Sequence, residues 1–151
     1  MQNFVSVDDV LDFAISREEE AYEFYTGLSE NMSNPAMQQV FREFAAEEQM
    51  HRAKLLQVKA GEANIIEFQD IKDLAIGDYL VDVKPEPGMS YQQALIVAMK
   101  REKSAYKLYS HLSQHVTSPA LKGLFLGLAN EEAKHKLRFE IEYDDAVLKD
   151  N

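Results

Sequence analysis

Residues 47–51 of the chain read Glu-Glu-Gln-Met-His, and residues 131–135 read Glu-Glu-Ala-Lys-His. In each stretch a glutamate precedes a histidine by three residues, so the two side chains share one face wherever the stretch is helical. The offset of 84 residues between the stretches extends over much of the chain. Residues 6–54 superpose on residues 90–138 without a gap, and 17 of the 49 paired positions are identical. The chain is therefore expected to contain one structural unit twice.

Each repeat predicts a pair of helices. Ser6 and Ser90 are suitable N-cap residues, and each precedes a long stretch whose apolar residues recur at helical spacing. Pro35 and Pro119 favour the first turn of the next helix, where the missing N–H of proline is not needed. The predicted helices span roughly 6–30, 34–60, 90–115 and 118–145. Because the connection within each pair is short, its two helices are expected to be antiparallel neighbours.

A longer segment, residues 61–89, separates the two predicted hairpins. It contains three glycines and two prolines and is too long for a tight turn. We expect it to run along the helices as a crossover, which makes the second and third helices parallel. The predicted fold class is all-α: a single domain over residues 1–151, in which two pseudo-symmetric helical hairpins form a four-helix bundle.

The composition excludes several classes of function. The chain has no cysteine, so disulfides, thiolate metal sites, iron–sulfur clusters and a cysteine nucleophile are all ruled out. Lys and Arg number 16 against 26 Asp and Glu, and the net charge of −10 opposes binding to nucleic acid or to an anionic membrane. No stretch approaches 18 consecutive apolar residues, and the first 15 residues lack the basic start of a signal peptide. We expect a cytoplasmic protein with no membrane segment.

Charged residues interrupt the apolar stripe near the middle of each predicted helix. A glutamate on each of two helices, with Glu-x-x-His on each of the other two, is the pattern of ferritin-like di-iron and di-manganese carboxylate proteins. Four carboxylates also balance the charge of two divalent cations, and carboxylate with imidazole suits iron or manganese. Without cations, four carboxylates at one level of a bundle would be very destabilising. The predicted metal ligands are Glu18, Glu48, His51, Glu102, Glu132 and His135.

Four tyrosines accompany this pattern. Tyr25 and Tyr109 lie two helical turns beyond the glutamate of their own helix, too far to reach it. Helical side chains lean toward the N-terminus, so each phenol is expected to donate a hydrogen bond to a glutamate of a facing helix. The alternative is a core tyrosine whose hydroxyl has another partner. Tyr22 and Tyr106 are expected to pack in the core, with control of access to the site as the alternative.

At these residues the chain resembles the rubrerythrin-type members of the ferritin-like superfamily, without their C-terminal rubredoxin domain. The matching stretches are residues 18–25, 47–51, 102–109 and 131–135. The resemblance implies a ferritin-like bundle around a non-haem di-iron centre that reacts with peroxide or dioxygen. It also implies that Glu48 and Glu132 bridge the two iron ions and that the other four ligands are terminal.

The chain departs from that family at Ala105, where rubrerythrins that reduce peroxide usually carry an additional carboxylate. The remaining six ligands are more symmetric, as in bacterioferritins. Without a rubredoxin domain, turnover requires an external electron donor such as a rubredoxin or a flavoprotein. The expected function is reduction of hydrogen peroxide. The alternatives are a ferroxidase or dioxygen-reducing protein, and an iron-binding protein that is not an enzyme.

Two further features concern residues outside this pattern. Gly123 and Gly127, among several leucines, make the fourth predicted helix apolar on more than one face, which favours a homodimer. His111 and His115 are spaced like metal ligands, but their repeat counterparts are Gly27 and an asparagine. These two histidines are therefore expected to lie outside the pseudo-symmetric site.

Overall fold

The computed structural model describes residues 7–61 and 88–150. These residues form four α-helices and no strand: α1 (Val7–Asn31), α2 (Pro35–Gly61), α3 (Tyr91–His115) and α4 (Pro119–Asp150). The predicted all-α class and the four-helix bundle are confirmed. Nearly all of the predicted crossover lies outside the described residues. None of the described helices is long and apolar enough to cross a membrane.

Three of the four helix starts show the expected capping. Ser90 Oγ accepts a hydrogen bond from the Gln93 backbone N–H at 3.1 Å, and the Gln93 side chain accepts one from the Ser90 N–H at 3.0 Å. This reciprocal pair is a capping box. Asn34 Oδ1 accepts from the Ala36 N–H at 2.8 Å, directly before α2, and Ser118 Oγ accepts from a backbone N–H of α4 at 3.3 Å. The α4 helix continues to Asp150 rather than ending near 145, because no glycine or proline follows Gly127.

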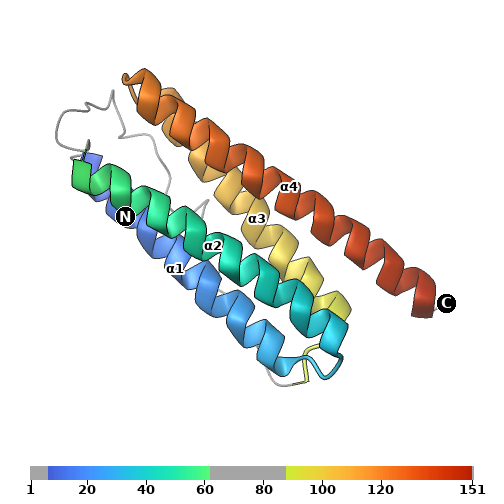
Figure 1. The fold of residues 1–151 in the computed structure, drawn as a ribbon. Helices are drawn as coiled ribbons and strands as arrows, with labels where there is room; N and C mark the ends of the chain where they lie inside the picture. Colours follow the sequence, from blue (N-terminus) through green and yellow to red (C-terminus); the bar gives the residue numbers. More distant parts are fainter. Residues whose placement is uncertain (1–6, 62–87, 151) are drawn as a thin grey trace.

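The helices are arranged as two antiparallel hairpins, with α1 packed along α2 and α3 along α4 (Figure 1). Figure 1 also shows α2 and α3 running in the same direction, as expected for hairpins joined by a crossover. The 84-residue offset maps α1 onto α3 and α2 onto the first part of α4. The hairpins are therefore related by a pseudo-twofold axis perpendicular to the bundle. This axis passes between α1 and α3 on one face and between α2 and α4 on the other.

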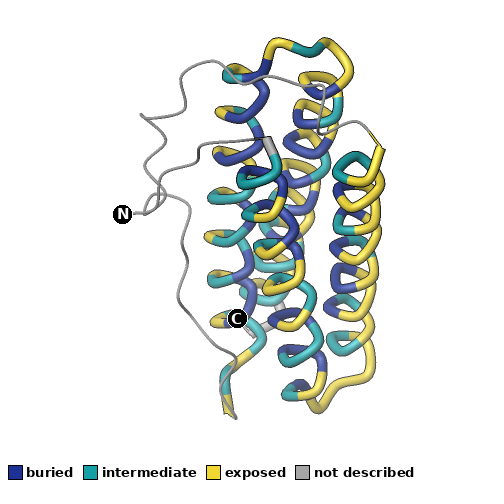
Figure 2. Tube along the Cα trace, turned by 90° about the vertical axis from the view of Figure 1, so that its left-hand side faces the viewer, coloured by how far each residue is buried: buried dark blue, intermediate teal, exposed yellow. Residues whose placement is uncertain are grey.

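Buried residues line the inner sides of all four helices (Figure 2) and form two apolar clusters at opposite ends of the bundle. One cluster includes Leu11, Leu55, Leu112 and Phe125, and the other includes Leu28, Phe41, Leu95 and Phe139. The layer between them contains most of the buried polar side chains. An apolar bundle with a polar centre is the arrangement that the interrupted stripes predict.

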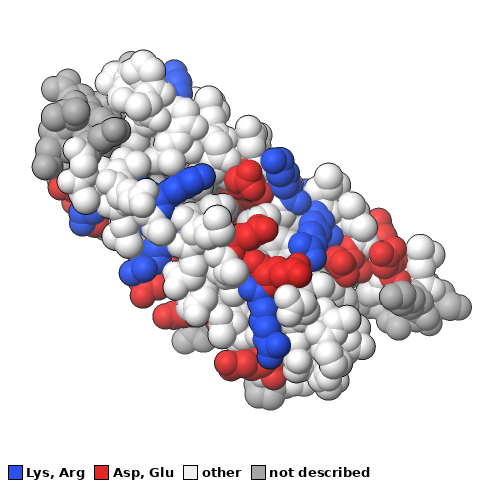
Figure 3. Space-filling view, in the orientation of Figure 1, with Lys and Arg blue, Asp and Glu red and all other residues white. Residues whose placement is uncertain are grey.

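The outer surface differs from the sequence expectations at two points. Tyr22 packs partly buried against a core cluster, but Tyr106 is 42% exposed, so the core position expected for Tyr106 is wrong. Tyr22 and Tyr106 each lie one position off the inward stripe of their helix, so neither side chain reaches the centre of the core. On α4, Leu126 is exposed, and Gly123 and Gly127 have open space around them. Figure 3 shows charged side chains across the face that includes α2 and α4, with acidic groups gathered near its middle.

We expect Phe139→Ala to destabilise the protein by about 3–5 kcal/mol, because it leaves a cavity in a closely packed aromatic cluster. Phe139 is fully buried, and its ring centroid lies 4.1 Å from that of Phe44. Leu137→Ala removes an exposed side chain of α4 and is the control, with an expected change within about 0.5 kcal/mol. Urea denaturation measures both variants. Equal effects would contradict the assignment of Phe139 to the core.

Candidate metal centre

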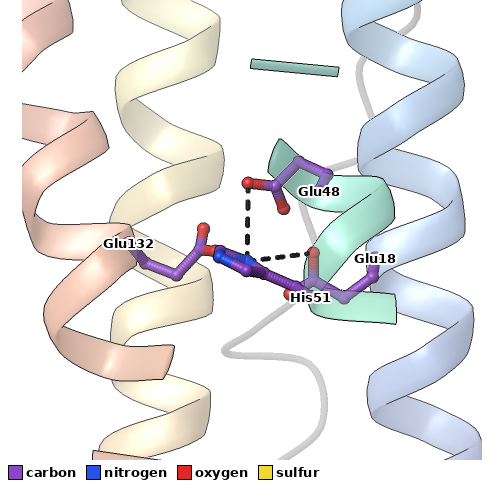
Figure 4. Close-up of side chains that lie close together, drawn as sticks. All are labelled: Glu18, Glu48, His51 and Glu132. Carbon is purple, nitrogen blue, oxygen red and sulfur yellow. Dashed lines mark ion pairs between the residues drawn. The ribbon is translucent and has the colours of Figure 1, made fainter. Parts of the chain in front are cut away.

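All six predicted ligand side chains meet at the middle of the bundle. Each is at most 6% exposed, and together they draw on all four helices. Figure 4 shows four of them, from α1, α2 and α4, pointing toward one another. The complete set is Glu18 on α1, Glu48 and His51 on α2, Glu102 on α3, and Glu132 and His135 on α4.

The six side chains form two overlapping groups of possible ligand atoms. The first group is Glu18, Glu48, His51 and Glu132. The second group is Glu48, Glu102, Glu132 and His135. Within each group the ligand atoms lie within 4.8 Å of one another. Because Glu48 and Glu132 belong to both groups, the arrangement suits two neighbouring cations that share two carboxylates.

The histidines connect the two hairpins across this layer. His51 Nδ1 lies 2.9 Å from Glu132 Oε1, and His135 Nδ1 lies 3.2 Å from Glu48 Oε1. Each Nδ1 is also 3.7 Å from a carboxylate oxygen of a third helix, Glu18 for His51 and Glu102 for His135. The imidazole rings are stacked with their centroids 5.8 Å apart. Both histidines therefore direct Nδ1 toward the carboxylates.

Each of the six side chains has a buried atom without a hydrogen-bond partner among the described residues. The atoms are Glu18 Oε2, Glu48 Oε1, His51 Nδ1, Glu102 Oε2, Glu132 Oε1 and His135 Nδ1. Leaving one such group unsatisfied costs about 1–3 kcal/mol, and more for a charged group. By contrast, the buried hydroxyls of Ser29 and Ser113 each donate to a carbonyl of their own helix. Unpaired acceptors that converge in this way fit a pair of bound cations.

The electrostatics of the layer lead to the same conclusion. Burial raises the pKa of Glu48 well above its usual value, and the charge of Glu18 raises it further. Burial and the charge of Glu102 likewise raise the pKa of Glu132. For Glu102, burial alone would raise the pKa, but the proximity of Glu132 and His135 and the hydrogen bond from Tyr25 lower it. Without cations, the layer therefore holds protons on some of its carboxylates, and divalent cations can replace those protons.

Tyr25 and Tyr109 make the contacts with a facing helix that the sequence predicts. The Tyr25 hydroxyl donates to Glu102 Oε1 at 2.5 Å, and the Tyr109 hydroxyl donates to Glu18 Oε1. In both glutamates the other oxygen, Oε2, is one of the unpaired atoms of the layer. Each tyrosine therefore holds one oxygen of a carboxylate and leaves the second oxygen for a cation.

Glu47 also belongs to this site, although it is not among the residues predicted from the sequence. Its carboxylate contacts His135 Nε2 from the outer side of the bundle. A carboxylate at Nε2 fixes the proton there and leaves Nδ1 free to bind a metal. The repeat could have indicated this residue, because Glu47 and Glu131 are identical counterparts directly before the two predicted ligands.

His111 and His115 lie apart from the site, near the end of α3, where His115 Nδ1 is 2.6 Å from the carbonyl oxygen of His111.

Comparisons with known proteins agree with this fold. The family model for rubrerythrin matches residues 9–72 and 93–150. A hypothetical protein from Pyrococcus furiosus shares 25% identity, with 92% of this chain and 89% of that chain covered and a TM-score of 0.71. A protein from Thermotoga maritima, assigned as a ferritin-like diiron-carboxylate protein, shares 19% identity, with 97% and 99% covered and a TM-score of 0.76. At that identity the likeness supports the fold alone. The chain has no match among curated proteins. Since the family model matches most of the chain, this protein belongs to the rubrerythrin family.

Proposed function

We propose that the six buried side chains bind two iron ions as a di-iron centre. The observation that carries the proposal is the convergence of six buried ligand atoms that make no hydrogen bond among the described residues, in two groups that share Glu48 and Glu132. Four carboxylates supply the negative charge that two divalent cations require. Membership of the rubrerythrin family supports iron as the metal, and the same hard donors also suit manganese.

Each residue has a definite role in this proposal. Glu48 and Glu132 would contribute donors to both ions, because they alone belong to both groups of ligand atoms. Each of the other four donors belongs to one group only. Glu18 and His51 would hold one ion, and Glu102 and His135 would hold the other. The centre is held by both hairpins, so its formation also joins the two halves of the bundle.

We further propose that the protein reduces hydrogen peroxide, with electrons from an external donor such as a rubredoxin or a flavoprotein. When bound, the metal pair supplies two electrons, which with two protons convert one peroxide into two water molecules. The chain contributes geometry and a dry environment. Burial and the charge of a nearby glutamate raise the pKa values of Tyr25 and Tyr109. Their hydroxyls therefore stay protonated and act as fixed hydrogen-bond donors.

A ferroxidase or dioxygen-reducing function is the second candidate. The observation that favours it is the symmetry of the six donors, three from each hairpin, with alanine at both Ala21 and Ala105. A protein that binds iron without turnover is the third candidate.

A cytoplasmic location and a homodimer also remain predictions. The surface that we propose for self-association consists of the exposed Leu126 of α4 with Gly123 and Gly127.

We expect Glu48→Ala and Glu132→Ala each to lose the paired site, because each variant removes a carboxylate that both ions share. The metal content measured after anaerobic loading with Fe²⁺ should fall from two ions per chain to at most one. Glu23→Ala, at an exposed position of α1, is the control and should keep two. Unchanged metal content in both bridging variants would contradict the assignment.

We expect the metal-free protein to lose stability as the pH rises above about 4.5, because burial raises the folded-state pKa values of Glu48 and Glu132. The folded state then binds more protons than the unfolded state, so ionisation of these two groups favours unfolding. Thermal denaturation from pH 5 to pH 8 measures the trend. The double variant Glu48→Gln/Glu132→Gln should reduce the slope, and loading with metal should raise the transition temperature most at the upper end of this range. A slope that is the same in the double variant would contradict this account.

We expect oxidation of the Fe²⁺-loaded protein to be faster with peroxide than with dioxygen. The experiment is stopped-flow mixing of anaerobic protein, loaded with two Fe²⁺ per chain, with each oxidant in turn. Absorption in the near ultraviolet follows the formation of ferric iron. Equal or faster oxidation by dioxygen would replace the peroxidase proposal with the ferroxidase or dioxygen-reducing one. Loaded protein that reacts with neither oxidant would favour simple iron binding.

A further inference from the structure

The pseudo-twofold axis leaves the bundle through two faces with opposite charges. Between α1 and α3 it passes the repeat-equivalent pair Arg17 and Arg101. Between α2 and α4 it passes the equivalent pair Glu47 and Glu131. The metal layer lies between these two pairs. The two approaches to one site therefore differ in the sign of the charge that an incoming molecule meets.

A small cavity connects the metal layer with the α1/α3 face. It has a volume of about 30 Å³, and its inner wall consists of four carboxylates and the two buried tyrosines. This is enough space for one or two water-sized molecules. Ala21, Ser104 and Ala105 line its outer part, and all three are partly exposed. Short side chains at these positions leave an opening through which a molecule of two or three heavy atoms can reach the layer.

Arg101 gives this opening a positive charge. Its guanidinium lies 4.4 Å from the centre of the Phe24 ring, which holds it at the cavity wall. Its Nε is buried and has no hydrogen-bond partner among the described residues, so it can donate to an incoming acceptor. Arg17 also lines the cavity and is paired outside it with Glu20 at 2.6 Å. Since two divalent cations neutralise the four carboxylates, the arginines would leave the loaded site attractive to a small anion.

The α2/α4 face presents a wider groove of about 490 Å³. His51 lines this groove and directs its buried, unpartnered Nδ1 toward the carboxylates of the layer. Glu47 and Glu131 stand beside it, and Figure 3 shows acidic groups gathered at the middle of this face. Lys54 also lines the groove, and Lys134 Nζ lies 3.5 Å from Glu131, so these two lysines offset part of this charge. A cation that enters the groove meets carboxylates first and the ligand His51 next.

We infer that the two faces sort the reactants, divalent cations by their charge and the oxidant by its small size. Divalent cations reach the centre from the α2/α4 groove, and a small anionic or peroxide-sized ligand reaches it from the α1/α3 cavity. In this arrangement Ala21 and Ala105 limit the size of the ligand, and Arg101 donates a hydrogen bond to it. The inference rests on the proposed metal centre and adds a direction of access for each reactant.

The same substitution at opposite ends of the axis tests the charge effect. Gln57→Lys adds a positive charge to the α2/α4 groove, and Ser104→Lys adds one at the α1/α3 opening. Stopped-flow absorption follows Co²⁺ uptake by metal-free protein at low ionic strength. Gln57→Lys should slow uptake about four- to sixfold, the effect of a single charge about 8 Å from a divalent cation in water at low ionic strength, and Ser104→Lys should leave the rate unchanged. Slower uptake in Ser104→Lys alone, or to the same extent in both variants, would overturn the cation route.

Azide binding to the Co²⁺-loaded protein tests the other route, with the cobalt absorption spectrum as the readout. Ala105→Leu should fill the opening and raise the azide Kd at least tenfold, whereas Ala53→Leu, on the α2/α4 groove, should leave it unchanged. Arg101→Gln should raise the azide Kd about tenfold through loss of a charge-assisted hydrogen bond. Weaker azide binding in Ala53→Leu but not in Ala105→Leu would overturn the anion route. A wild-type protein that takes up no Co²⁺ would instead refute the proposed metal centre, and each variant's Co²⁺ content separates the two failures.

Discussion

The whole bundle depends on one electrostatic constraint: four carboxylates are buried at one level of an apolar core. Such a layer is stable only with protons or cations to balance it, because burying uncompensated charge costs far more than a domain of this size can supply. The surrounding structure follows from that requirement. Two histidines contribute ring nitrogens, two tyrosines each hold a carboxylate of a facing helix, and the apolar clusters lie above and below the layer. The polar centre thus interrupts the apolar core, and a pair of bound cations can compensate its charge.

The internal repeat explains why the two halves of the site are so alike and also where they differ. Residues that face the layer are identical in both hairpins, as Glu18 and Glu102 show. On the outer surface the constraint disappears, and the exposed Glu19 and Glu23 of α1 correspond to the exposed Lys103 and Lys107 of α3. Duplication therefore fixed the geometry of the donors and left the charge of each outer face free to change. The opposite charges at the two ends of the axis do not arise from such changes. Arg17 and Arg101 at one end are identical in the two repeats, as are Glu47 and Glu131 at the other.

Local spacing along each helix made most of the site predictable from the sequence. The pairs Glu48 with His51 and Glu132 with His135 lie on one face of a helix, and the repeat implied that the helices meet at one level. Contacts between helices were harder to predict. The role of Glu47 depends on how α2 sits against α4, and the exposure of Tyr106 depends on how far α3 is rotated about its own axis. The cavity beside Ala105 and Arg101 arises from the packing of α1 on α3, which no single stretch of sequence encodes.

The charge balance of the donor set links the fold to its chemistry. Four carboxylates neutralise two divalent cations, but two trivalent cations carry two further positive charges that the six donors do not balance. In the proposed di-iron centre, oxidation would therefore create a demand for negative charge from solvent. The α1/α3 cavity is lined by Arg101 with an unpaired donor, whereas the α2/α4 groove is lined by glutamates. In our proposal a small anion is attracted to the α1/α3 cavity and repelled by the glutamates of the α2/α4 groove. The difference between the two faces would therefore matter most for the oxidised centre, which needs additional negative charge.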